Sequence, residues 1–298
     1  MIRAENVTMK FQQFTALDGL SCSIPRGCVY GLVGSNGAGK STFMRLVAGV
    51  YRPMGGRVTV EDVPVYDSPE AKARIAFVPD DLFFLPHASM DRMADLYKAN
   101  YAHFSEERYF ELVSAFGLNR GANLATFSKG MRRQAAIILA LSALPDYILF
   151  DETFDGLDPV MRNLVKKVIY SDVESRQATA VISSHSLRDL EDTCDQLALL
   201  HRGGLIFESE IENLKTSLFK VQLAFADDYD KHVLDGIEVL NWSKKGSVAN
   251  AIVRGDREQV RENLAAKSPL LLDILPLTLE EIFIYEMEAL GYAFHEVL

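Results

Sequence analysis

The chain contains few cysteines and no long apolar run, and each absence excludes a class of protein. The three cysteines, Cys22, Cys28 and Cys194, are odd in number and lack C-x-x-C spacing, which argues against a disulfide framework or a metal site. The longest apolar stretch, residues 135–144, is too short to cross a bilayer and predicts a buried helix. We therefore expect a chain that works in a reducing cytoplasm and has no membrane span of its own.

A signal-peptide pattern is missing from the opening residues. Basic residues are also fewer than acidic residues. The chain has 31 basic and 41 acidic residues, which gives a formal net charge of −10. This charge repels nucleic-acid backbones, so we expect no nucleic-acid partner. With 298 residues, of which 48% are hydrophobic, the chain is long enough for one large domain or one domain with a small appendage.

Apolar runs and helical spacing alternate along most of the chain. Short runs bounded by Gly, Pro or Asp predict a β-rich opening with strands at residues 1–7, 20–24, 29–33, 58–60 and 75–78. Helical spacing then predicts a helical segment over residues 90–143. Further strands are expected at residues 147–150, 179–182 and 197–200, separated by helices at residues 162–170 and 187–193. This alternation predicts an α/β fold with a largely parallel sheet, whose ligands bind at the carboxyl ends of the strands.

Beyond residue 212 the pattern changes again and predicts a small C-terminal α+β extension. Strands are expected at residues 219–225, 239–242, 248–253 and 270–275, with a helix at residues 256–266. Thr278 and Glu281 have the spacing of a capping box at the start of a final helix. We therefore expect domains at residues 1–212, with a helical insertion at about 82–143, and at residues 213–298. The second is either a regulatory or dimer-stabilising domain or a β-rich extension that covers a sheet edge.

A complete phosphate-binding-loop pattern follows the predicted strand at residues 29–33 and precedes a helical run. Its residues are Gly34, Ser35, Asn36, Gly37, Ala38, Gly39, Lys40 and Ser41, and we assign Thr42 to the same nucleotide site. Glycines let consecutive amides point at one anion, and the following helix presents its own unpaired amides. We assign Lys40 to the β and γ phosphates and the Ser41 hydroxyl to Mg²⁺. Agreement of pattern and context disfavours the alternative of a glycine-rich turn with a surface lysine.

Two acidic residues, Asp151 and Glu152, end the apolar run at residues 147–150. Successive side chains of a strand point to opposite faces, so the two carboxylates cannot do the same work. Asp151 is expected to hold Mg²⁺, directly or through water, and Glu152 to orient or polarise an attacking water. The alternative, two acids that only solvate a strand end, is disfavoured by the phosphate loop upstream.

These residues resemble those of ATP-binding subunits of ABC transporters, from about residue 2 to residue 207. Residues 127–131, Phe-Ser-Lys-Gly-Met, are similar to the family's signature Leu-Ser-Gly-Gly-Gln, and Ser128 is placed to cap the helix that follows. The resemblance implies a P-loop NTPase fold, with a β-rich N-terminal subdomain and a helical insertion. It also implies that Ser128 and Gly130 bind the γ-phosphate held by the other subunit of a dimer.

The resemblance implies roles for further residues. Phe11 takes the aromatic position that stacks on adenine, although an aromatic before a strand is more often a core residue. His185 takes the position of the switch histidine that contacts the γ-phosphate, and residues 155–158 resemble the loop that links the two sites of the dimer. Asp80 stands where the family has Gln and is expected to reach Mg²⁺ or water. Lys129 and Met131 also depart from the signature, and residues 153–155 depart from Pro-Thr-Ser.

The function implied is an ATPase with ATP and Mg²⁺ as cofactors, working as a homodimer or as a heterodimer with a paralogue. It would drive a separate transmembrane permease, for export, from the cytoplasmic face of the membrane. Aromatic residues of the segment after Asp80 would line a groove for the permease or would only pack in the core: Phe83, Phe84, Tyr97 and Tyr101. Two alternatives remain: a soluble ABC-type ATPase with a non-membrane partner, and a nucleotide-gated module that barely hydrolyses.

Overall fold

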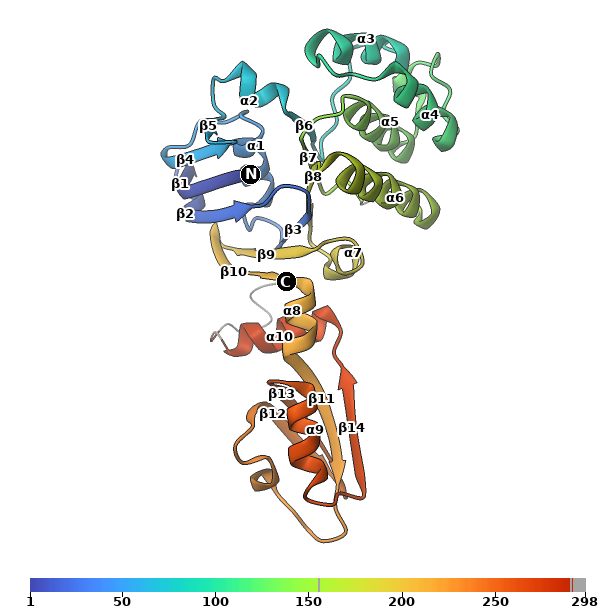
Figure 1. Cartoon of the computed structure of the whole chain (residues 1–298). Coiled ribbons are helices and arrows are strands. Elements are labelled where there is room, and N and C mark those ends of the chain that lie inside the picture. Colours follow the sequence, from blue (N-terminus) through green and yellow to red (C-terminus); the bar gives the residue numbers. More distant parts are fainter. Residues whose placement is uncertain (155, 290, 292–298) are drawn as a thin grey trace. The chain divides into compact units, whose positions relative to one another are not determined.

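The computed structural model describes residues 1–154, 156–289 and 291. They form two compact units, one over Met1–Glu208 and one that begins at Ser209 (Figure 1).

A six-stranded sheet is the centre of the first unit. Its strands run in the order β10 (Gly204–Glu210), β9 (Gln196–His201), β3 (Val29–Val33), β8 (Thr179–Ser184), β7 (Tyr147–Asp151) and β6 (Ile75–Val78). The pairs that join β9, β3, β8, β7 and β6 are parallel, as predicted. Every residue of β3, β7 and β8 is buried, which explains their continuous apolar runs, since helices cover both faces of such sheets.

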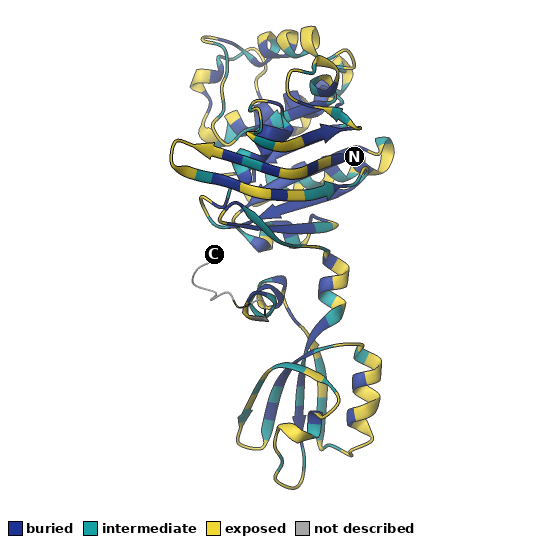
Figure 2. Cartoon of the chain, turned by 90° about the vertical axis from the view of Figure 1, so that its left-hand side faces the viewer, coloured by how far each residue is buried: buried dark blue, intermediate teal, exposed yellow. Residues whose placement is uncertain are grey.

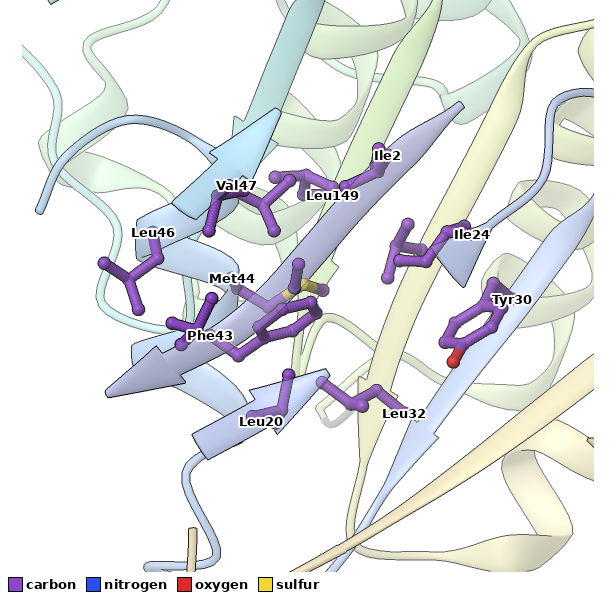
Figure 3. Close-up of a cluster of buried hydrophobic side chains, with 14 of the residues drawn as sticks. Ile2, Leu20, Ile24, Tyr30, Leu32, Phe43, Met44, Leu46, Val47 and Leu149 are labelled. Atoms are coloured by element: carbon purple, nitrogen blue, oxygen red, sulfur yellow. The ribbon is translucent and has the colours of Figure 1, made fainter. Parts of the chain in front are cut away.

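A second, antiparallel sheet accounts for the β-rich opening. Its order is β2 (Phe14–Ile24), β1 (Ile2–Phe11), β4 (Gly55–Val60) and β5 (Val63–Pro64). Buried and exposed residues largely alternate along β1 (Figure 2), so one face of this strand is turned to the core. Helix α1 (Lys40–Val47) lies between the two sheets, with Phe43 and Met44 packed among Ile2, Leu20 and Leu32 (Figure 3).

The predicted helical insertion is present and consists of three helices. They are α3 (Met90–Asn100), α4 (Glu106–Phe116) and α5 (Lys129–Ser142), with a short 3-10 turn at Leu124–Thr126. Ser89, Ser105 and Ser128 cap their N-termini by accepting an amide hydrogen bond three residues on. The apolar run at residues 135–144 is confirmed as a buried helix over residues 135–142, which lie on α5 and are all buried, and the helix ends two residues before the run does.

Three further helices complete the first unit: α2 (Pro69–Ala73), α6 (Pro159–Arg176) and α7 (Leu187–Glu191). Helix α6 begins at the cap Asp158, whose carboxylate accepts from the amides of Val160 and Met161. In the described part of the chain, no helix combines the length and the apolar character that crossing a membrane requires.

The second unit is an α+β structure. Helix α8 (Ile211–Ser217) leads into an antiparallel sheet of order β12 (Glu238–Lys245), β13 (Val248–Arg254), β11 (Leu218–Ala224) and β14 (Leu271–Pro276). Val260 and Leu264 of α9 (Arg257–Ala265) pack on Phe219 and Val253 of this sheet. The unit begins before the boundary expected after residue 212, because α8 is a helix that the sequence pattern did not predict.

The capping box of the last helix is confirmed. In α10 (Leu279–Ala289) the Thr278 hydroxyl accepts from the Glu281 amide at 3.2 Å, and the Glu281 carboxylate accepts from the Thr278 amide at 2.9 Å. Two orphan donors are satisfied by this exchange. Helix α10 contacts α8 within the same unit.

Candidate functional site

The phosphate loop connects β3 to α1, as its pattern predicts. Two of its glycines are required by close backbone approach. A Cβ at Gly34 would lie 2.3 Å from the Leu200 carbonyl oxygen, and one at Gly39, where φ is 109°, would lie 2.6 Å from the Ala16 carbonyl oxygen. Because Gly39 is also the N-cap of α1, no side chain caps this helix. The first amides of α1 therefore remain for an anion.

Lys40 is nearly buried, and its ammonium lies at the mouth of the loop. The side chain is 4% exposed and its Nζ forms an ion pair with Glu152 Oε1 at 3.0 Å. It also donates to the carbonyl oxygens of Gly34 at 2.7 Å and Ser35 at 3.3 Å. An ammonium has three donors, so these three oxygens hold the charge at one point of the loop.

Asp151 lies at the end of β7 and is fully buried. One carboxylate oxygen, Oδ1, accepts from the Ser41 hydroxyl at 3.0 Å and from the Ser183 hydroxyl at 2.7 Å. The other oxygen, Oδ2, is buried and accepts from no described residue. Desolvation raises the pKa of this carboxyl, against the two hydroxyl hydrogen bonds, which lower it.

Glu152 points elsewhere, so the two carboxylates have different partners, in line with the alternation along a strand. Its Oε1 meets Lys40, and its Oε2 lies 2.9 Å from Nδ1 of His185. Its φ of 48° lies in the left-handed region, where a glutamate is strained. The amide of Glu152 donates to the Ser183 hydroxyl at 3.0 Å, which helps to hold this conformation.

A single cleft brings most of the predicted residues together. Its described lining consists of Phe14, Ala16, Asn36, Gly37, Gly39, Lys40, Ser41, Thr42, Asp80, Lys129, Glu152 and His185. Asp151 is buried beside Ser41, and Gly34, Ser35 and Ala38 complete the loop. The arrangement brings the Lys40 ammonium together with two hydroxyls of α1 and with carboxylates, which suits a magnesium-bound polyphosphate.

The aromatic residue at the cleft differs from the predicted one. Phe11 is 40% exposed and packs edge-on against Tyr51, with ring centroids 5.5 Å apart. Its register partner across the hairpin, Phe14, is 59% exposed and lines the cleft. The adenine-stacking role of Phe11 stays a prediction, and Phe14 is a second candidate that the motif comparison did not find.

The signature-like segment starts α5. The Ser128 hydroxyl accepts from the Met131 amide at 3.2 Å, which confirms its predicted cap role. A Cβ at Gly130 would lie 3.1 Å from the Gly156 carbonyl oxygen, so the segment closely approaches the loop at residues 156–158. Asp155, which the resemblance places in that loop, lies outside the described residues. The γ-phosphate role of Ser128 and Gly130 stays a prediction.

Arg133 and Ser183 are site residues whose roles the sequence analysis missed. Arg133 is buried on α5 and binds the Asp80 carboxylate at 2.6 Å, whereas the family resemblance predicted that Asp80 reaches Mg²⁺ or water. Arg133 stands between Arg132 and Gln134, before the apolar run at residues 135–144, so no signal in the sequence showed that this arginine is buried. Nothing in the sequence indicated that the Ser183 hydroxyl would reach Asp151.

The chain is similar to known ATP-binding proteins of ABC transporters. The family model of ABC transporters matches residues 17–155. The chain is 26% identical over 285 residues to the ABC transporter ATP-binding protein YtrB of Bacillus subtilis, covering 95% of this chain and 97% of YtrB. It is 33% identical over 233 residues to the ABC transporter ATP-binding protein NatA of the same organism, covering 73% of this chain and 92% of NatA.

The chain is also similar to a drug-resistance protein and to a solved structure. The chain is 34% identical over 215 residues to the daunorubicin/doxorubicin resistance ATP-binding protein DrrA of Streptomyces peucetius, covering 68% of this chain and 63% of DrrA. A solved ATP-binding subunit of an ABC transporter superposes with a TM-score of 0.67 at 24% identity, covering 72% of this chain and 92% of that one. The latter similarity supports the P-loop NTPase fold.

Proposed function

Because the chain belongs to the ATP-binding proteins of ABC transporters, we propose that it hydrolyses Mg-ATP at this cleft to drive a separate membrane permease. The observation that carries the proposal is the convergence of Lys40, Ser41, Asp151 and Glu152. The Lys40 ammonium meets one carboxylate at 3.0 Å, and the Ser41 hydroxyl meets the other at 3.0 Å. Charge and metal-ligating oxygens thus lie at the N-terminus of α1, where phosphate binds best.

The phosphate loop would grip the triphosphate. Amides of the loop and of the first turn of α1 point at the β and γ phosphates, and Lys40 supplies the positive charge. Because Lys40 also pairs with Glu152, the phosphates must compete with this carboxylate for the ammonium. Phe14 or Phe11 would stack on the adenine.

The residues at the end of β7 fit a magnesium ion. Asp151 offers Oδ2, a buried oxygen that accepts from no described donor, and Ser41 offers its hydroxyl nearby. Oxygen ligands of this kind suit Mg²⁺, which usually keeps several waters and binds through one or two carboxylates and substrate phosphates. When bound, the metal would neutralise charge on the phosphates. Asp80 lines the same cleft and stays a candidate for a contact through water.

Glu152 would act on the attacking water. A carboxylate held in the cleft would accept a hydrogen bond from the water and take its proton as the water oxygen bonds to the γ-phosphorus. The bond from this phosphorus to the bridging oxygen of the β-phosphate breaks in the same step, and ADP is the leaving group. His185 lies 2.9 Å from the second oxygen of Glu152, so it would orient this carboxylate and contact the γ-phosphate. Departure of ADP then releases the grip of the loop.

We place two copies of the site in a dimer, either of this chain or of this chain and a paralogue. The amides at the N-terminus of α5, next to Ser128 and Gly130, would bind the γ-phosphate held by the other subunit. The loop at residues 155–158 would link the two sites. This assignment rests on the family resemblance and on the cap that Ser128 makes to Met131.

The permease would dock on the groove between α2 and α3. Tyr97 and Tyr101 stack there with ring centroids 5.6 Å apart, and Pro69, Lys72 and Leu96 line the same hollow. Phe83, which is 77% exposed, lies in the segment just before α3. Docking would place the chain at the cytoplasmic face of the membrane.

The resistance relative DrrA favours export over import, and the net charge of −10 disfavours nucleic acid as a partner.

Phosphate release by the purified chain tests the proposal directly. We expect the wild-type chain to hydrolyse Mg-ATP and the Lys40→Ala variant to have lost this activity. The control variant Lys167→Ala, which removes an exposed lysine of α6, should hydrolyse at the wild-type rate. Absence of hydrolysis and of millimolar Mg-ATP binding in the wild-type chain would contradict it. Co-purification tests whether a permease is the partner. A membrane protein encoded by an adjacent gene should co-purify with the chain, whereas a ribosomal or other non-membrane partner would favour the soluble alternative.

A further inference from the structure

Arg133 of α5 bridges the ends of two strands of the parallel sheet. Its side chain is only 2% exposed. One terminal nitrogen, Nη2, donates to Asp80 Oδ1 at 2.6 Å and to the Asp80 carbonyl oxygen at 3.0 Å. The other, Nη1, donates to the carbonyl oxygen of Glu152. One buried guanidinium thus joins the loop after β6 to the residue after β7.

These contacts act on the main chain of Glu152, whose side chain is the proposed base. Its amide donates to the Ser183 hydroxyl at 3.0 Å, and its carbonyl oxygen accepts from Arg133. The peptide groups on both sides of the Glu152 Cα are therefore held from outside. A glutamate at φ 48° persists only where its surroundings impose that conformation. Arg133 therefore helps to decide where this carboxylate points.

The same arginine ties Asp80 to the helix that carries the signature-like segment. Arg133 lies one turn beyond Ser128 and Gly130 on α5, most of whose later residues are buried. Asp80 and Lys129 both line the nucleotide cleft. A displacement of Asp80 would therefore be transmitted to the N-terminus of α5 and to Glu152 through a single planar group.

We propose that Arg133 is a positioning residue that orients Glu152 for hydrolysis, and that the Asp80 carboxylate holds Arg133 in place. This inference rests on the proposed ATPase function. The Asp80 carboxylate thus acts in catalysis through Arg133. It requires no direct contact with the nucleotide. The pair couples three parts of the chain: the loop after β6, the end of β7 and the N-terminus of α5.

Arginine suits this role better than lysine. Its guanidinium stays charged and presents donors in a rigid planar fork, so it binds the Asp80 and Glu152 oxygens in one fixed geometry. A lysine ammonium is a point charge on a flexible stem and would not hold both oxygens at the same time. Neutralising Asp80 leaves the buried guanidinium with a weaker acceptor, which loosens the position of Arg133.

A double-mutant cycle on steady-state hydrolysis tests the proposal. We expect Asp80→Asn and Arg133→Gln each to lower kcat by about tenfold or more, whereas the Kd for a fluorescent ATP analogue changes by less than about threefold. The double variant should be no slower than Arg133→Gln alone, because both changes break one interaction. Arg133→Lys should recover only part of the kcat. If Arg133→Gln does not fold, Asp80→Asn and Arg133→Lys, with their double variant, form the same cycle.

Matched controls are adjacent in the chain. Asp81→Asn and Arg132→Gln change exposed neighbours of the same residue types and should keep the wild-type kcat. The proposal is overturned if the two single effects multiply in the double variant, or if the single variants keep the wild-type kcat. It is also overturned if their nucleotide affinity falls as much as their kcat, or if the control variants slow equally. A wild-type chain without hydrolysis would instead overturn the proposed function itself, and the positioning role with it.

Discussion

Replacement of Glu152 by glutamine separates nucleotide binding from hydrolysis. Glu152→Gln keeps the shape of the side chain but removes the charge that meets Lys40 at 3.0 Å and His185 at 2.9 Å. A glutamine cannot take the proton of the attacking water. General-base catalysis contributes about 10²–10⁴-fold, so kcat should fall by this factor. On the activation free energy this is about 3 to 5 kcal/mol.

The same substitution should tighten ATP binding. Lys40 and Glu152 are 4% and 13% exposed, and the phosphates must displace this carboxylate from the ammonium. Exposed ion pairs contribute up to about 1 kcal/mol, and this less exposed pair belongs at that upper end. Relief of the competition should lower the Kd by roughly fivefold.

Two measurements on purified protein check these expectations: phosphate release at saturating Mg-ATP and titration with a fluorescent ATP analogue. Glu111→Gln, which changes an exposed glutamate of α4, is the control and should behave as the wild-type chain. Turnover of Glu152→Gln at the wild-type rate would refute the assignment of the base. Weaker nucleotide binding would refute the competition between Glu152 and the phosphates.

Three further substitutions address the metal, the adenine and the start of α5. Asp151→Asn should abolish hydrolysis but raise the free energy of unfolding at pH 7 by roughly 0.5–2 kcal/mol. Burial raises the pKa of this carboxyl, so the ionised form destabilises the fold at neutral pH. The gain in stability should shrink as the pH falls through this raised pKa, and it should be lost by about pH 4, the ordinary pKa of an aspartate. Phe14→Ala should weaken binding of a fluorescent adenine nucleotide by about 1 kcal/mol, and a larger effect of Phe11→Ala would reverse this choice. Ser128→Ala removes the acceptor of the Met131 amide and should cost about 1 kcal/mol of stability; unchanged melting would contradict the cap.

Much of the fold could be predicted because its signals are local. Buried parallel strands need apolar residues on both faces, so β3, β7 and β8 are visible as continuous apolar runs. The capping box of α10 depends on residues only three positions apart. Helix α8, of seven residues, was not predicted.

The positions of the phosphate loop and of the acidic pair were also predicted from the sequence. A phosphate cradle is made of consecutive amides, so its glycines and Lys40 must be neighbours in the chain. The alternation of a strand sends Asp151 and Glu152 to different partners. These constraints are local, and the sequence by itself therefore determined the phosphate-loop geometry and the divergence of the two carboxylates.

Only the tertiary structure decided how that chemistry is held. Ser183 reaches Asp151 because β7 and β8 lie side by side in register. Arg133 reaches Asp80 and Glu152 because α5 packs near the ends of β6 and β7. Such contacts join residues far apart in the chain, and their partners depend on packing and sheet order, which no single segment encodes.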